Sequence, residues 1–226
     1  MAVLRDAWRI ARKDLTVEAR SRELVLTLLF FSLACLLIFA FAFVRGRSTV
    51  DNAPAGIIWI TVVFAGTLAL GRTFERERQG DTLRALLLTP IERPSIYLGK
   101  LLSQLILLAG VQAMILPLVG LLFGAPILRA PALLVGLLAL GTIGFAAVGT
   151  LFAAMLVRAA SRDLLLPVVL YPITMPAILA GMQGTLWILG PEPDLDLARN
   201  WLAMLIFFDA VFITLALWTF GPVMRE

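Results

Sequence analysis

The chain has 226 residues, of which 61% are hydrophobic, and its mean hydropathy is +0.96. Soluble domains contain roughly 45–50% apolar residues, so one water-soluble core cannot bury this much apolar surface. The formal net charge is +4, but no soluble face interleaves basic and aromatic residues as nucleic-acid-binding proteins do. The length leaves no room for a separate catalytic domain beside a membrane domain. We therefore expect an integral membrane protein that takes any energy it needs from a partner, and we expect no nucleic-acid partner.

The residue types that carry most cofactor and acid–base chemistry are scarce. Histidine is absent, and the single cysteine, Cys35, lies inside an apolar run, so no internal disulfide can form. The absence of histidine removes the commonest metal ligand, general base and haem ligand. Gly99 and Lys100 lack the other residues of a phosphate-binding loop. We expect no catalytic residue and no metal or cofactor site in this chain.

Six apolar runs are long enough to cross a bilayer, whose core of roughly 30 Å needs ~20 residues of helix. The expected fold is an all-α integral membrane protein with six transmembrane helices in a single domain at 24–223. The expected spans are about 24–44, 56–71, 101–123, 132–157, 164–180 and 202–223. A cytoplasmic loop at 72–100 separates the second span from the third.

Residues 1–23 are expected to form an amphipathic helix at the membrane surface. Its apolar residues fall on one side at helical spacing, and basic residues surround the rest. The apolar residues are Leu4, Ala7, Trp8, Ala11 and Leu15, and the basic ones are Arg5, Arg9, Arg12 and Lys13. The alternative is a solvated basic tail.

The distribution of basic residues predicts the orientation of the spans. Fifteen of the 19 Lys and Arg residues fall in segments 1–23, 72–100, 158–163 and 224–226, and four fall in the other connections. Loops rich in Lys and Arg stay in the cytoplasm. Both termini are therefore expected to be cytoplasmic.

Small residues recur every four positions along the fourth run, at Thr142, Ala146, Thr150 and Ala154. Such a stripe allows another helix to approach closely. The stripe predicts helix packing, either within the chain or at a moving interface between subunits.

Three prolines in the fifth run, Pro167, Pro172 and Pro176, each remove a backbone donor. They predict a bent or broken helix. The segment 181–189 is then expected to be a separate short helix at the outer interface.

The loop at 72–100 is the longest charged stretch and the expected docking place for a partner. Asp81 can serve as the N-cap of a helix at 81–88, which ends before Pro90. The apolar residues of this helix are Leu83, Leu86 and Leu87, and charged residues precede it. Two interpretations stay open: the helix fits a groove on a protein, or it lies on the lipid headgroups.

Two stretches of the sequence resemble the haem exporter protein B family, the permeases of the cytochrome c maturation system. The first comprises Glu77, Arg78, Gly80, Leu83, Leu86, Leu87, Pro90, Arg93, Tyr97, Gly99 and Lys100. The second comprises 141–152, Arg162, Asp163, 164–167, Pro172 and Pro176. The first stretch is shared with the broader class of ATP-driven exporter permeases, whereas the second points to the cytochrome c system.

The resemblance implies a permease subunit in the bacterial inner membrane that couples ATP hydrolysis to haem export or to release of a haem-loaded chaperone. The implied partners are an ATP-binding cassette subunit in two copies, which binds the ATP, and haem-handling membrane subunits; a homodimer is also compatible. The expected coupling residues come from this resemblance and from the helix at 81–88, and they are Glu77, Arg78, Gly80, Asp81, Leu83, Leu86, Leu87, Pro90 and Arg93. One alternative is a permease for lipid or drug-like molecules. Another is a mechanical subunit that transports nothing itself.

Polar residues within the spans are the remaining candidates, because an unpartnered polar group in hydrocarbon is costly. Asp209 is the one acid inside an expected span, and it is either functional or a neutral carboxyl held in packing. Gln104 and Gln112 lie eight residues apart on one face of the third span. The two glutamines are expected to join helices by hydrogen bonds.

The charge distribution predicts the outcome of topology mapping. Reporter fusions after Ser48 and Asp194 should report the outside, and fusions after Gln79 and Glu226 should report the cytoplasm, because basic loops are retained there. Paired alkaline phosphatase and fluorescent-protein fusions measure this directly. A cytoplasmic signal at Asp194 would contradict six spans.

Overall fold

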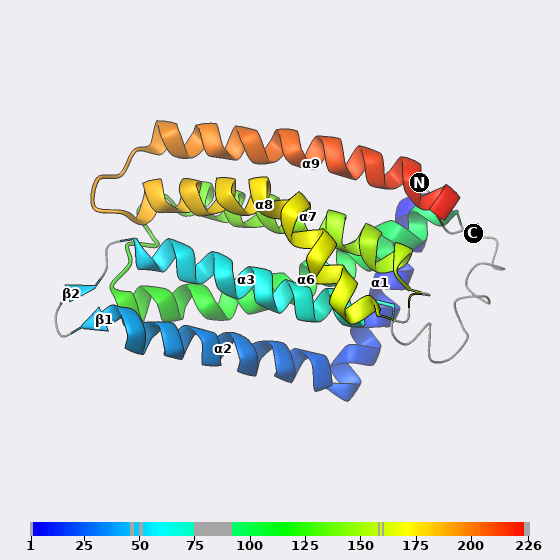
Figure 1. Cartoon of the computed structure of the whole chain (residues 1–226), viewed down its shortest axis with the longest axis horizontal. Helices are drawn as coiled ribbons and strands as arrows, with labels where there is room; N and C mark the ends of the chain where they lie inside the picture. The colour runs from blue at the N-terminus through cyan, green and yellow to red at the C-terminus, as the bar shows by residue number, and fades with distance from the viewer. Residues whose placement is uncertain are drawn as a thin grey trace.

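The computed structural model describes residues 2–45, 48–49, 52–74, 92–157, 159 and 161–223. Across these residues the chain is helical apart from a pair of two-residue antiparallel strands (Figure 1). In chain order the elements are α1 (Ala2–Ser21), α2 (Glu23–Phe43), β1 (Val44–Arg45), β2 (Ser48–Thr49), α3 (Ala53–Arg72), α6 (Arg93–Phe123), α7 (Pro131–Met155), α8 (Arg162–Leu189) and α9 (Leu195–Val223).

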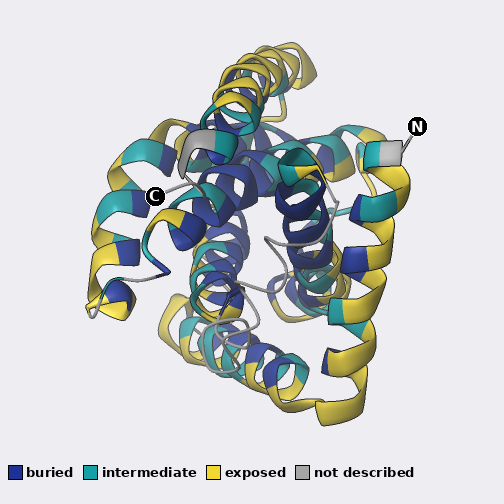
Figure 2. Ribbon diagram, turned by 90° about the vertical axis from the view of Figure 1, so that its right-hand side faces the viewer, coloured by how far each residue is buried: buried dark blue, intermediate teal, exposed yellow. Residues whose placement is uncertain are grey.

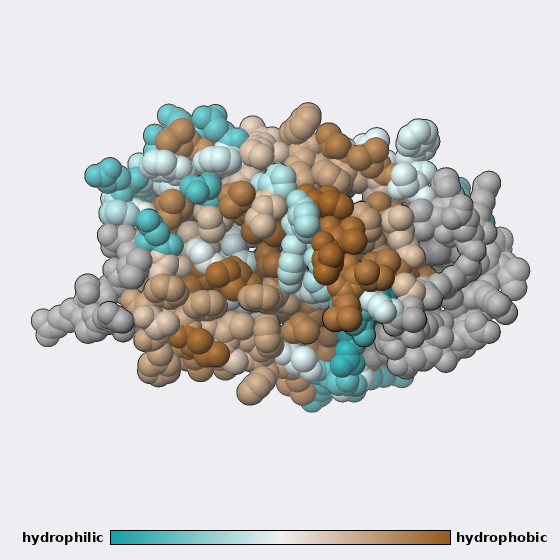
Figure 3. Space-filling view, in the orientation of Figure 1, coloured by the Kyte–Doolittle hydropathy of each residue, from teal (hydrophilic) through white to brown (hydrophobic). Residues whose placement is uncertain are grey.

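The six helices other than α1 are each long and apolar enough to cross a membrane. They run along the long axis of the molecule, while α1 crosses one end of the bundle, here called the α1 end (Figure 1). The β1–β2 hairpin lies at the opposite end. On the face in Figure 3 hydrophobic residues cover the middle and hydrophilic residues gather towards the two ends. The prediction of an all-α membrane fold with six spans is confirmed.

The helices extend beyond the apolar runs that predicted them. The helix of the third expected span, α6, begins at Arg93 rather than at 101. The helix of the last span, α9, begins at Leu195 rather than at 202. Their polar first turns are stabilised by end signals that a hydropathy window does not detect. Pro94 occupies the first turn of α6, and the Asp194 carboxylate accepts hydrogen bonds of 2.9 Å from the N–H groups of Asp196 and Leu197.

The fifth span is one helix, so the prediction of a separate short helix at 181–189 was wrong. Helix α8 runs from Arg162 to Leu189 through all three prolines, and Figure 1 shows it bending along its length. Each proline removes one backbone hydrogen bond, whereas a full break would expose many polar groups to hydrocarbon. The bent helix is the less costly solution.

The apolar face of helix α1, which the sequence predicted to contact the membrane as a whole, has a buried part and an exposed part. Ala7 and Ala11 are buried, and α1 packs along α6, whereas Leu4 and Trp8 remain 71% and 53% exposed. The end view in Figure 2 shows α1 with buried residues turned toward the bundle and exposed ones away from it. Only part of the apolar face is therefore free to enter the membrane.

A tryptophan wedged between two glycines sets the spacing of the central helices. Trp59 of α3 contacts Gly141 of α7 and Gly181 of α8 so closely that a Cβ atom at either glycine would overlap the indole ring. The indole Nε1 also donates a hydrogen bond of 3.0 Å to Thr185 Oγ1. Close packing of this kind holds membrane helices together, because lipid tails are as apolar as the helix surfaces.

Substituting Gly141 by Ala should lower the stability of the solubilised chain. The added methyl group must displace Trp59, and overpacking of this kind costs about 1–3 kcal/mol. Gly110→Ala is the matched control: a Cβ there meets no atom within 4 Å, and Gly→Ala within a helix gains about 0.5–1 kcal/mol. Thermal unfolding in detergent measures both variants, and equal melting temperatures would show that Trp59 is not wedged.

Candidate functional site at the α1 end

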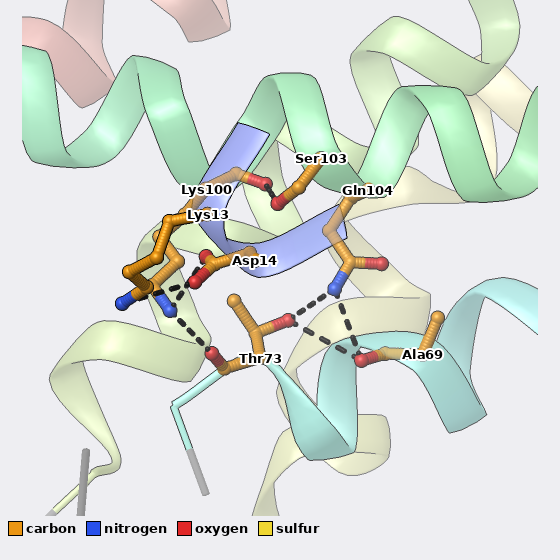
Figure 4. A network of polar contacts seen from close by, with 7 residues as sticks. All are labelled: Lys13, Asp14, Ala69, Thr73, Lys100, Ser103 and Gln104. Atoms are coloured by element: carbon orange, nitrogen blue, oxygen red, sulfur yellow. Dashed lines mark hydrogen bonds and ion pairs between the residues drawn. The ribbon is translucent and has the colours of Figure 1, made fainter. Parts of the chain in front are cut away.

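The carbonyl groups at the end of α3 need donors from outside that helix, since the last turn of any helix leaves its carbonyls without intrahelical partners. Helix α6 supplies them. Lys100 Nζ donates to the Thr73 carbonyl oxygen at 3.0 Å. Gln104 Nε2 donates to the Ala69 carbonyl oxygen at 3.1 Å and to Thr73 Oγ1 at 2.6 Å (Figure 4). A cation at this helix end also complements the helix dipole.

Lys100 joins a third helix to this cluster. Its side chain is 3% exposed, and the ammonium group lies 2.9 Å from Asp14 Oδ2 of α1 and 5.3 Å from the centre of the Phe74 ring. Lys13 Nζ lies 3.1 Å from the other Asp14 oxygen. We call this cluster the polar junction; its residues are Lys13, Asp14, Thr73, Lys100, Ser103 and Gln104. It ties α1, α3 and α6 together.

The backbones of α1 and α6 come close beside the polar junction. A Cβ atom at Gly99 would lie 2.7 Å from Ile10 Cβ and 2.8 Å from the Ala7 carbonyl oxygen. Glycine is therefore required at position 99 if α1 is to lie close enough for Asp14 to reach Lys100.

Other cations fasten further helices at the same end. Arg162, at the start of α8 and almost fully buried, donates to the Gly71 carbonyl oxygen of α3. Arg93, at the start of α6, donates to the Gly221 carbonyl oxygen of α9 at 2.7 Å. Arg72 pairs with Glu23 of α2 at 2.7 Å. Each of these contacts connects an end of α3 or α6 to a different span.

The residues predicted to couple this chain to a partner fall mostly in the segment between Phe74 and Glu92. Arg93 is the exception and lies in the first turn of α6. The other eight, Glu77, Arg78, Gly80, Asp81, Leu83, Leu86, Leu87 and Pro90, lie outside the described residues. What the structure describes is where this segment leaves the bundle and where it returns: it leaves beside the polar junction after Thr73, and it returns at the start of α6, about two turns before Lys100.

The two glutamines of α6 contact different helices. Gln104 reaches α3 in the polar junction, whereas Gln112 Nε2 donates to Thr142 Oγ1 of α7 at 2.6 Å. Thr142 belongs to the predicted small-residue stripe. All four residues of that stripe, Thr142, Ala146, Thr150 and Ala154, are buried.

Asp209 lies away from the polar junction, in α9. It is 5% exposed, and neither carboxylate oxygen has a hydrogen-bond partner among the described residues. The neighbouring helix presents Gly144 to it. The structure does not bring Asp209 together with either glutamine of α6.

Sequence reasoning missed most of the polar junction. Asp14, Thr73 and Ser103 were not selected as site residues, and Lys100 was noted only within the resemblance and as part of a rejected phosphate-binding motif. One signal was available, because Lys100 is a lone cation directly before a long apolar run, where it must find partners inside the protein. Its partners on α1 and α3 could not be named without the fold.

Six helices long and apolar enough to cross a membrane define a multi-pass integral membrane protein, and the polar junction ties two of them to α1. A family model described as CcmB protein matches residues 5–226, and the chain belongs to that family. It is 29% identical to "Heme exporter protein B" of Escherichia coli (strain K12) over 97 residues, which are 43% of this chain and 44% of the relative, less than half of that protein's length. It is 26% identical to "Heme exporter protein B" of Pseudomonas aeruginosa (PAO1) over 172 residues, which are 76% of each chain.

Replacing Lys100 by Met should destabilise the α1 end, because it removes the donor to Thr73 and leaves Asp14 with Lys13 alone. Hydrogen bonds to charged groups are worth about 1.5–3 kcal/mol, so a loss of that size is expected in thermal unfolding. Lys13→Met is the matched control, because this half-exposed pair should be worth at most about 1 kcal/mol. Equal losses in the two variants would mean that Lys100 does not hold the junction.

Proposed function

We propose that this chain is the membrane subunit of an ATP-binding cassette complex for cytochrome c biogenesis. In this proposal a separate subunit binds and hydrolyses ATP, and the membrane domain uses the resulting movement to export haem or to release a haem-loaded chaperone. Membership of the CcmB family and the relatives named "Heme exporter protein B" support the proposal. This chain itself holds no cofactor in the proposal; ATP is held by the partner, and haem is the cargo.

The observation that carries the coupling role is the way the segment between Phe74 and Glu92 is anchored. Lys100 and Gln104 bind the end of α3 to the first turns of α6, so the two helices that flank the segment are fastened to each other. A force applied to the segment therefore moves α3 and α6 as one body. Asp14 passes that movement to α1 through Lys100. Rigid-body movement of packed helices is an established form of such coupling.

The orientation that this role requires agrees with the charge distribution. The α1 end carries the ends of the basic segments, which favours its placement on the cytoplasmic side, where an ATP-binding subunit would lie. The expected helix at 81–88 would then present Leu83, Leu86 and Leu87 to a groove on that subunit. The full set of proposed partners is two copies of the ATP-binding cassette subunit, haem-handling membrane subunits and a second copy of this chain.

Co-purification separates this role from that of a lipid or drug exporter. Recovery of haem-handling membrane proteins with the tagged chain from native membranes would support the cytochrome c role. Recovery of an ATP-binding subunit alone, from cells that are making cytochromes c, would favour the other exporter.

Replacing Leu86 and Leu87 together by Asp should detach or uncouple the ATP-binding subunit. Burying one Leu is worth roughly 1.5–3 kcal/mol, and the new charges would oppose an apolar groove. We expect normal membrane insertion with a sharp fall in co-purified ATPase and in cytochrome c maturation. Leu128→Asp is the control, since Leu128 is 81% exposed and lies between α6 and α7 at the opposite end of the bundle. If the double variant retains the ATPase and still matures cytochromes c, the segment is a membrane-surface helix and the coupling role is wrong.

A further inference from the structure

Asp209 lies at the middle of the membrane domain. It lies fourteen positions along the helix from Leu195 and fourteen from Val223, the two ends of α9. At about 1.5 Å per residue, each end of the helix is about 21 Å away. Gly144, which faces it, is likewise central in α7, between Pro131 and Met155. Neither residue is near an interface at which water could solvate a charge.

The chain itself encloses the carboxyl group. A Cβ atom at Gly144 would lie 2.5 Å from Asp209 Oδ1 and 2.9 Å from the Phe208 ring, so the backbone of α7 lies directly against these two side chains of α9. Both carboxyl oxygens are buried, and neither has a hydrogen-bond partner among the described residues. The carboxyl group is therefore buried by the chain itself, in addition to any burial by surrounding lipid.

No charged group of the described helices lies near the middle of the bundle to balance a carboxylate. Helix α7 contains no Asp, Glu, Lys or Arg, and the charged residues of the other helices packed on α9 lie near their ends. These are Arg93 and Lys100 of α6, Arg162 and Asp163 of α8, and Asp196 and Arg199 of α9 itself. A metal ion is not a substitute, because the described residues contain no cluster of three or more potential acidic, His or Cys ligands.

An ionised carboxylate in this position would be buried in a low-dielectric interior with nothing to compensate its charge, which is strongly unfavourable. A protonated carboxyl carries no net charge and can stay beside Gly144. We infer that Asp209 is a proton-binding site at the contact between α7 and α9. In the protonated state α9 stays packed against α7 at Gly144. Release of the proton to water requires α9 to separate from α7 at this contact, so that water can reach the carboxylate.

Infrared spectroscopy of the chain in lipid nanodiscs tests this site without any substitution. Carboxyl-carbon-labelled aspartate shifts the C=O band of a protonated Asp and leaves protonated Glu unaffected. We expect one label-sensitive band of a protonated carboxyl, and we expect Asp209→Asn to abolish it. Asp196→Asn, the same change at an exposed position of the same helix, should leave the band in place.

A second measurement tests whether protonation of Asp209 stabilises the folded chain. The melting temperature of the wild-type chain in detergent should fall more steeply than that of Asp209→Asn as the pH rises from about 4, the ordinary pKa of an aspartate, through neutral. The reason is that the neutral form is favoured in the folded chain and the ionised form in the unfolded one. Absence of the protonated-Asp band in the wild-type chain, or equal pH dependence of the two melting curves, would overturn the inference. Neither result bears on docking at 81–88, so this site and the proposed function can fail separately.

Discussion

The contact between the Lys100 ammonium and the Thr73 carbonyl is the interaction on which the α1 end depends. A helix that ends inside a membrane protein must find donors for its last carbonyl groups, and a cation that enters the bundle must find acceptors. Lys100 meets both needs at once, and Asp14 balances its charge. Helix α1 is consequently part of the membrane domain and not an appendage, because its Asp14 supplies a negative charge beside the buried ammonium group.

Away from the α1 end, close packing at small residues holds the helices of the bundle together. Membrane helices gain little from hydrophobic attraction to one another, so they associate where small residues allow close contact. Helix α7 is the central example: Gly141 accommodates Trp59, Gly149 accommodates Leu70, and Gly144 accommodates Asp209. The first two contacts join α7 to α3, and the third joins it to α9. One helix thus sets the spacing of spans on two of its sides.

The sequence was sufficient for the number of spans and for the small-residue face of α7, because hydropathy and four-residue spacing are local properties. It was insufficient where partners come from distant segments. Gln104 and Gln112 share one face of α6, yet one bonds to α3 and the other to α7. The prolines of α8 correctly indicated a bend but not the continuity of the helix, which is decided by the cost of exposing backbone to lipid. Helix ends were misjudged for the same reason, since caps lie outside the apolar runs.

The polar junction and Asp209 lie at different depths, and helix α9 runs from the start of α6, at the α1 end, to the depth of Asp209. Its end is fastened to the start of α6, where Arg93 donates to the Gly221 carbonyl and the Tyr97 ring lies 5.4 Å from that of Phe220. Tyr97 also donates a hydrogen bond of 3.0 Å to the Ala147 carbonyl of α7. A displacement of α6 would therefore reach α9 at its end first. Because α7 presents only Gly144 to Phe208 and Asp209 of α9, tilting α9 from its fastened end would open the contact around Asp209 before it disturbed the Trp59 wedge between α3, α7 and α8.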